Sequence, residues 1–253
     1  MTARLTGRNC DDLRPLLKRF PVKVAADDDA TPGTETHDAD FVICSGGDGS
    51  LLGAERQFPL LPKLAIRDRR NNPKCPLHGD EQVLEAFFSG QLKPQMIAHL
   101  QAARNGKVLL DGINDIVVMR QVQSGAIRCR LRENGALRRP QVISDGIVFC
   151  TAFGSTGYFQ SITRGNFRCG LGIAYSNPMD GDSFAVLGEE AVVALELLRG
   201  PAFVVADNNP EMLTMRDGES LELRIAQQRT AVFGIEAFRC PECHRLRFKD
   251  TEN

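Results

Sequence analysis

The chain has 253 residues, of which 42% are apolar and 25% are charged. This length suits one large or two small domains, and the composition is that of an ordinary soluble protein. The formal net charge of −1 gives no overall electrostatic reason to expect nucleic acid or an anionic membrane as a partner. Because no apolar run approaches the roughly 20 residues of a membrane-spanning helix, we expect no membrane partner.

The first 94 residues predict an α/β domain. Residues 41–44 form a continuous apolar run, typical of a buried parallel strand. The other segments alternate, with helices predicted at 11–20, 51–58 and 81–88, strands at 22–25 and 63–66, and an acidic loop at 27–40. Such alternation indicates a doubly wound, mostly parallel sheet, which binds ligands at the carboxyl ends of its strands.

From residue 95 to about residue 235 the sequence predicts a β-rich domain. Residues 127–132 alternate strictly between apolar and polar side chains, as a half-buried strand does. Asn134-Gly135 follows and is the strongest short signal for a hairpin. Residues 189–198 fit either a helix or a strand. Further strands are expected at 142–143, 147–150, 203–206 and 221–225.

The eight cysteines and the N-terminal residues indicate a cytoplasmic protein. Most of the cysteines stand alone in the sequence, and several lie in apolar runs where cysteine acts as a small hydrophobic residue. This pattern favours a reducing compartment over a disulfide framework. Residues 1–20 carry charges throughout and do not form a secretory signal.

The glycine-rich run after residue 44 has the composition of a phosphate-binding turn, Gly46-Gly47-Asp48-Gly49-Ser50. Glycine lets the backbone approach a ligand closely, and the N–H groups at the start of the following helix would form an anion site. Asp48 would hold a substrate hydroxyl, or a metal that bridges phosphates, in line for attack. The alternative is a tight strand-to-helix turn that Asp48 caps.

Two later segments suit a nucleotide. Asn114 and Asp115 precede a strongly apolar strand and offer donors and acceptors for a base edge and ribose hydroxyls; the alternative is an Asx turn that leads into the strand. Residues 144–158 comprise Ser-Asp-Gly, an apolar strand and a second glycine turn, which combines hydroxyl groups with an aromatic ring for polar contacts and stacking. That turn is Gly154-Ser155-Thr156-Gly157-Tyr158.

The order of these motifs, GGDGS, then IND before a strand, then SDGIVFCTAFGSTGY, resembles the NAD kinases. Their superfamily also contains the diacylglycerol-type lipid kinases. The resemblance runs from about Phe41 to Asp207 and implies a two-domain fold with the active site between the domains and a tail, residues 236–253, that returns to the first domain. It implies transfer of a phosphoryl group from ATP or another donor to the 2′-hydroxyl of the adenosine ribose of NAD, with Mg²⁺ or another divalent cation.

The resemblance also implies roles for individual residues. Asp48 matches the catalytic aspartate that orients or deprotonates the hydroxyl. Asn114 and Asp115 match an Asn-Glu pair that holds the adenosine ribose and base. Asp145 matches an aspartate on the nicotinamide side, and Asp207 falls where the family has a late Asp-Gly. The adenine pocket is matched by Thr156, Gly157, Tyr158 and Ser161. The turn around the catalytic aspartate contributes Gly46, Gly47, Gly49 and Ser50.

The sequence departs from the family pattern after its first motif. The family has a Gly-Asn-Gly-type turn there, whereas this chain has a basic loop with Arg67, Arg69 and Arg70. Either these arginines bind the phosphates, or this part of the pocket has changed its ligand. The usual first strand, before the opening helix, looks short or missing, and Asp115 is one methylene shorter than the usual Glu.

Two other functions fit the same residues. The first is a kinase of the superfamily that acts on another hydroxyl, of a lipid or a sugar; the lost glycine turn favours it and the GSTGY block opposes it. The second is a non-catalytic dinucleotide-binding protein that regulates a partner. By analogy with the family we expect NAD and a nucleoside triphosphate as ligands, no nucleic acid, and a homodimer or homotetramer.

Two short motifs suggest a structural zinc site as a further hypothesis. Cys240 and Cys243 form a CxxC near the C-terminus, and Cys75 and His78 form a CxxH in the first domain. Four such groups match a tetrahedral zinc site, and the returning tail would bring the two halves together. The alternatives are a redox-sensitive cysteine pair or two packed loops.

Overall fold

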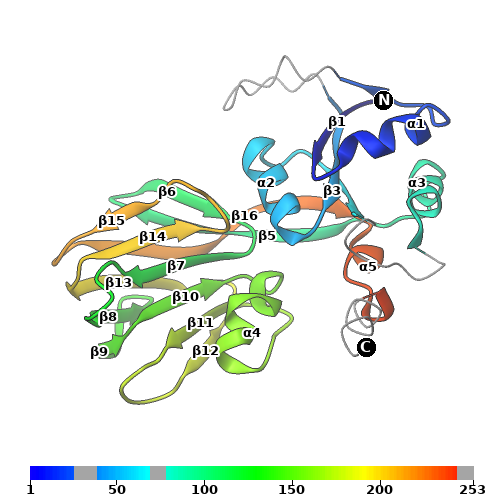
Figure 1. Ribbon diagram of the computed structural model, residues 1–253. Coiled ribbons are helices and arrows are strands. Elements are labelled where there is room, and N and C mark those ends of the chain that lie inside the picture. Colours follow the sequence, from blue (N-terminus) through cyan, green and yellow to red (C-terminus); the bar gives the residue numbers. More distant parts are fainter. Residues whose placement is uncertain (26–38, 69–77, 244–253) are drawn as a thin grey trace. The chain divides into compact units, whose positions relative to one another are not determined.

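The computed structural model describes residues 1–25, 39–68 and 78–243 (Figure 1). The described residues fall into two compact units, one within residues 1–97 and 230–253 and the other within 98–229. The sequence places the corresponding changes at 94/95 and 235/236. None of the helices in these described ranges is long and apolar enough to cross a membrane.

The first unit contains a parallel sheet with the strand order β2-β1-β3-β4. The end of β16 pairs in parallel with β4. The strands are β1 Thr2–Gly7, β2 Lys23–Val24, β3 Phe41–Gly46, β4 Lys63–Arg67 and β16 Ser220–Phe233. The helices are α1 Arg14–Leu17, which a 3₁₀ turn at Cys10–Leu13 precedes, α2 Asp48–Gln57, α3 Asp80–Phe88 and α5 Ile235–Phe238. This arrangement confirms the predicted α/β unit.

The expectation that the first strand is short or missing is wrong. Strand β1 has six residues and lies between β2 and β3 in the sheet. Its sequence TARLTG is weakly hydrophobic, with only Ala3 and Leu5 apolar, yet Ala3, Arg4 and Leu5 are all buried in the fold. Pairing on both edges, rather than local hydrophobicity, therefore decides this element.

A buried ion pair joins α2 to β4 in the same unit. Lys63 is fully buried and contacts the carboxylate of Glu55, which is 4% exposed. Glu55 Oε1 also accepts hydrogen bonds from the Leu60 N–H at 2.7 Å and from Thr230 Oγ1 at 3.0 Å. Burial lowers the pKa of Lys63, and the adjacent Glu55 carboxylate opposes that shift. The pair fixes the helix that begins with Asp48 to the sheet beneath it.

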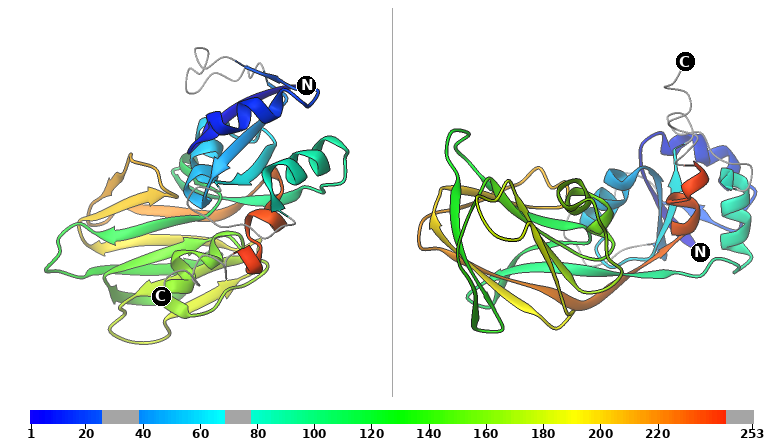
Figure 2. Two further views of the ribbon diagram at one scale, coloured as in Figure 1. Left: turned by 45° about the vertical axis from the view of Figure 1, so that its right-hand side comes forward. Right: turned by 90° about the horizontal axis from the view of Figure 1, so that it is seen from below.

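The second unit is built from two antiparallel sheets (Figures 1 and 2). One has the order β12-β11-β10-β7-β14-β15, and the other joins β13, β8, β9 and the first part of β16 with the hairpin of β5 and β6. Their inner faces share one core, to which Val118, Leu131 and Leu195 belong. The strands are β5 Gln95–Arg104, β6 Lys107–Gly112, β7 Asp115–Arg120, β8 Ile127–Glu133, β9 Ala136–Ser144, β10 Gly146–Cys150, β11 Leu171–Ser176, β12 Phe184–Leu187, β13 Val192–Arg199, β14 Ala202–Ala206 and β15 Leu213–Met215.

Local signals predict the hairpin of this unit correctly. Asn134 and Gly135 have φ values of 49° and 82° and connect β8 to β9, because the tight hairpin turn needs positive φ at both positions. Residues 189–198, which fit either element, form strand β13 from Val192, with alternating burial. The helix α4, Tyr158–Thr163, follows a 3₁₀ turn at Gly154–Thr156. The predicted β-rich unit is confirmed.

Candidate active site

Asp48 is the first residue of α2, at the carboxyl end of β3. The turn that precedes it needs glycine, since Gly46 has a φ of 140° and a Cβ atom there would lie 2.1 Å from Ser50 Oγ. The Ser50 N–H donates to the Gly47 carbonyl at 3.0 Å. The buried strand thus turns directly into the helix and leaves the Asp48 side chain 47% exposed, open to a ligand.

Two arginines flank the Asp48 carboxylate. Arg239, just after α5, donates from Nη2 at 2.9 Å and from Nε at 3.2 Å to Asp48 Oδ1. Arg67, the last residue of β4, lies with Nη2 3.4 Å from Asp48 Oδ2. Arg67 is held in turn by Phe238, whose carbonyl accepts from Nε at 2.9 Å and whose ring centroid lies 4.3 Å from the guanidinium carbon. One carboxylate and two guanidinium groups therefore meet at a helix N-terminus.

In the second unit Asp207 organises the turn that carries Asn114 and Asp115. Its carboxylate accepts hydrogen bonds from three consecutive N–H groups, those of Ile113 at 3.0 Å, Asn114 at 2.8 Å and Asp115 at 3.0 Å. Asp207 itself has a φ of 51° and donates its own N–H to the Asp115 carbonyl at 2.8 Å. Asn114 Nδ2 donates to Asp115 Oδ2 at 2.8 Å, which orients the Asn114 amide.

Both aspartates of this turn have raised pKa values. The pKa of Asp115 is raised to about 7, chiefly by burial and then by the charge of Asp207, while the hydrogen bond from Asn114 opposes the shift. Burial also raises the pKa of Asp207 to about 6, against the effect of its three backbone hydrogen bonds. Both carboxyl groups therefore keep their protons to a higher pH than free aspartates do.

The second glycine turn packs directly on the turn that carries Asn114, within the second unit. The Thr151 N–H donates to the Asn114 carbonyl at 3.0 Å. A Cβ atom on Gly154 would lie 1.9 Å from the same oxygen, and one on Gly157 would lie 3.3 Å from Asn114 Nδ2. Only glycine fits at position 154, and the missing side chain of Gly157 leaves space beside the Asn114 amide. The fold therefore brings together two motifs that the family resemblance assigns to the nucleotide.

The remaining residues of the second motif divide between ligand-accessible and internal roles. Thr156, Tyr158 and Ser161 are exposed, with Ser161 Oγ donating to the Tyr158 carbonyl at 2.7 Å. The Ser155 hydroxyl is buried and lies 2.7 Å from the Ala152 carbonyl, so this hydroxyl serves the fold. Asp145, between β9 and β10, accepts from Arg120 Nη1 at 2.5 Å and from Asn177 Nδ2 at 2.7 Å.

Comparison with known proteins gives a consistent result, although no family model matches the chain. The NAD kinase of Nitrosomonas europaea is 27% identical over 175 residues, covering 63% of this chain and 57% of that protein. The NAD kinase of Clostridium kluyveri is 28% identical over 174 residues, covering 64% and 61%. The chain thus matches less than two thirds of the length of these relatives.

Solved structures extend the likeness to the whole chain. A crystal structure of an NAD kinase from Archaeoglobus fulgidus in complex with ATP has a TM-score of 0.72 at 19% identity and covers 100% of this chain and 99% of that one. A yeast NADH kinase complexed with NADH has a TM-score of 0.74 at 12% identity, with 100% and 87% covered. The chain is related to the NAD kinases. This confirms the resemblance that the three motifs carry, and the fold is the two-domain fold of the NAD kinases.

Arg239 is a candidate active-site residue that the sequence analysis did not predict. It lies 191 positions from Asp48, and the only local signal is its position directly before Cys240. Of the predicted basic loop, Arg67 does lie beside Asp48, whereas Arg69 and Arg70 lie outside the described residues.

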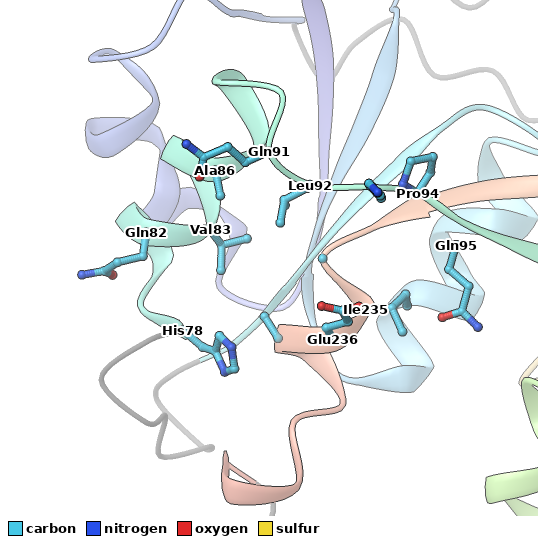
Figure 3. A pocket seen from close by; sticks show the side chains of 13 residues that line it. His78, Gln82, Val83, Ala86, Gln91, Leu92, Pro94, Gln95, Ile235 and Glu236 are labelled. Carbon is cyan, nitrogen blue, oxygen red and sulfur yellow. The ribbon is translucent and has the colours of Figure 1, made fainter.

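The structure describes three of the four predicted zinc ligands. His78, Cys240 and Cys243 come together with their ligand atoms within 4.8 Å of one another, and Cys75 lies outside the described residues. His78 also lines a cavity of about 520 Å³ between α3, the start of β5 and α5 (Figure 3). The turn from Gly46 to Ser50 contributes no lining to that cavity, so it is not the phosphate site that the sequence predicts.

Proposed function

We propose that the chain is an NAD kinase, which transfers the terminal phosphoryl group of a nucleoside triphosphate to the 2′-hydroxyl of the adenosine ribose of NAD. The observation that carries this proposal is the half-exposed Asp48 carboxylate at the N-terminus of α2, flanked by Arg67 and Arg239. Phosphoryl transfer needs little covalent chemistry from the protein, and catalysis comes from positioning and charge stabilisation. The Asp48 carboxylate would position the hydroxyl, and the two arginines would stabilise the charge of the phosphates.

Each group then has a defined part in the reaction. Asp48 accepts the proton of the attacking ribose hydroxyl, whose oxygen forms the new bond to phosphorus. The bond from phosphorus to the bridging oxygen of the triphosphate breaks, and the nucleoside diphosphate leaves with that electron pair. Arg67 and Arg239 stabilise the charge on the phosphate oxygens. Before the triphosphate binds, the same arginines are paired with Asp48, so the phosphates compete with the carboxylate for them.

A divalent cation such as Mg²⁺ completes the proposed cofactor set. Mg²⁺ is commonly held by one or two carboxylates together with substrate phosphates and water, and it neutralises phosphate charge when it is bound. The exposed Asp48 carboxylate has the donor type that this ion prefers, and Arg67 and Arg239 would share the neutralisation. We infer Asp48 as the protein ligand.

The second unit supplies the proposed dinucleotide site. Asn114 presents its amide to the adenosine, and Asp115, only 6% exposed, acts by fixing that amide rather than by reaching the ligand itself. Thr156, Gly157, Tyr158 and Ser161 form the exposed surface for the adenine, with the Tyr158 ring, 37% exposed, available for stacking. Asp207 is a positioning residue that holds the turn, and Asp145 lies with its Arg120 and Asn177 partners on the nicotinamide side.

An assay of NADP formation tests this function. Purified protein is incubated with NAD or NADH and a panel of phosphoryl donors, and the product is measured with an NADP-specific dehydrogenase. We expect product with at least one donor, and a loss of about 10²–10⁴-fold in rate for Asp48→Asn, with NAD binding retained in calorimetry. Calorimetric binding of NAD without turnover under any donor would select the regulatory alternative, and turnover of a lipid or sugar alone would select the other kinase.

A further inference from the structure

One cluster of sulfur and nitrogen ligands lies outside the proposed active-site residues. His78 stands two residues before α3, and Cys240 and Cys243 follow α5. The His78 Nδ1 atom lies 3.7 Å from Cys243 Sγ, and all three ligand atoms lie within 4.8 Å of one another. A tetrahedral Zn²⁺ with bonds of about 2.3 Å to sulfur and 2.05 Å to nitrogen separates those two ligands by about 3.6 Å. The observed pair already has that separation.

The chemistry of the donors points to the same metal. Both sulfur atoms belong to buried cysteines, which are 9% and 5% exposed and which form no disulfide within the described part of the chain. Thiolate and imidazole ligands select zinc over the hard cations that carboxylates prefer. Among the described residues, no other group of three or more His, Cys, Asp and Glu side chains is arranged in this way. A cysteine pair that served only as a redox switch would not need the imidazole.

We propose that His78, Cys240 and Cys243 bind one structural Zn²⁺, and that this metal fixes the segment after α5 so that Arg239 stays on Asp48. Arg239 is bonded to Cys240 in the chain, and it makes two hydrogen bonds to Asp48 Oδ1.

The local structure explains why a metal is needed there. Helix α5 has only four residues, and helices this short have no independent stability because nucleation is costly. A zinc ion would crosslink this segment to the start of α3, and Figure 3 shows His78 beside α5. The proposed metal thereby supports the position of an active-site arginine without touching the substrate.

Metal analysis of the full chain tests this proposal independently of any kinase activity. We expect about one equivalent of zinc per chain after dialysis, and a loss of most of it in the variants Cys240→Ser, Cys243→Ser and His78→Asn. The matched control is Cys169→Ser, because Cys169 is an exposed cysteine outside the cluster, and it should keep its zinc. Circular dichroism checks that each variant is folded.

A second measurement follows the consequence for Arg239. Removal of zinc with a thiol-reactive reagent or a chelator should speed amide hydrogen exchange in residues 235–243, while β3 and β8 exchange as before. Less than about half an equivalent of zinc in protein produced with zinc present would overturn the proposal. So would a disulfide between Cys240 and Cys243 in protein isolated without reductant, or unchanged zinc in the Cys240→Ser variant.

Discussion

Replacing Arg239 by alanine tests whether its ion pair with Asp48 serves mainly stability or catalysis. The change removes both hydrogen bonds from Arg239 to Asp48 Oδ1, at 2.9 and 3.2 Å. In the ligand-free protein the loss is small, because Asp48 is 47% and Arg239 24% exposed. Exposed ion pairs contribute about 0.2–1 kcal/mol, which corresponds to a fall of about 0.4–4 °C in Tm for a chain of this size.

In the transition state the same side chain is worth far more. A preorganised donor that stabilises developing charge contributes about 2.7–4 kcal/mol, or about 10²–10³ in kcat. We therefore expect Arg239→Ala to lose about that factor in NADP formation while its Tm moves by a few degrees. Arg239→Lys should recover part of the rate, since a point charge is restored without the planar fork.

The matched control is Arg130→Ala. Arg130 also donates to a carboxylate, that of Glu196 at 2.8 Å, and the two side chains are 35% and 38% exposed. Because this pair joins the neighbouring strands β8 and β13 and contains no proposed site residue, its loss should change Tm by a similar amount and leave the rate unchanged. If Arg239→Ala keeps its activity within about threefold of the parent while Arg130→Ala behaves as expected, the role given to Arg239 is refuted.

Three further predictions follow from other contacts. Lys63→Met leaves the Glu55 carboxylate buried without its cation and should cost about 3–5 kcal/mol of unfolding free energy. The double variant Glu55→Gln with Lys63→Met should cost less, because no buried charge then remains unpaired. Equal losses of unfolding free energy for the two variants in urea titrations would contradict this. Asp115 has a folded pKa of about 7, raised above its ordinary 3.8, so the folded state holds the extra proton between these values and stability should fall as pH rises from about 4 to about 7. Asp115→Asn should flatten that slope in pH-dependent unfolding, and an unchanged slope would argue against the assignment. Gly154→Ala places a Cβ atom 1.9 Å from the Asn114 carbonyl. It should weaken NAD binding in calorimetry about 5- to 150-fold, through a cost of about 1–3 kcal/mol. Gly188→Ala, with open space around its Cβ position, is the control and should bind normally.

The sequence predicts well where local chemistry decides the structure. The apolar run of β3 followed by glycines correctly gives a buried strand that turns into a helix, because the turn needs positive φ at Gly46. The hairpin at Asn134-Gly135 follows from the same requirement. The sequence also marks both nucleotide motifs, but their contact at Gly154 and the Asn114 carbonyl is known only from the structure. The roles of these residues in binding and catalysis stay predictions.

The sequence alone determines the succession of an α/β unit and a β-rich unit, the two glycine turns and the likeness to the NAD kinases, since these depend on neighbouring residues and their spacing. The tertiary structure decides what is not local. Strand β1 is a strand because β2 and β3 pair with it, and residues 192–199 are a strand because β8 and β16 flank them. Arg239 meets Asp48 across 191 positions, and His78 meets Cys243 across 165. No short-range pattern encodes such meetings, because they arise only when the chain folds back and buries its segments against the same sheet.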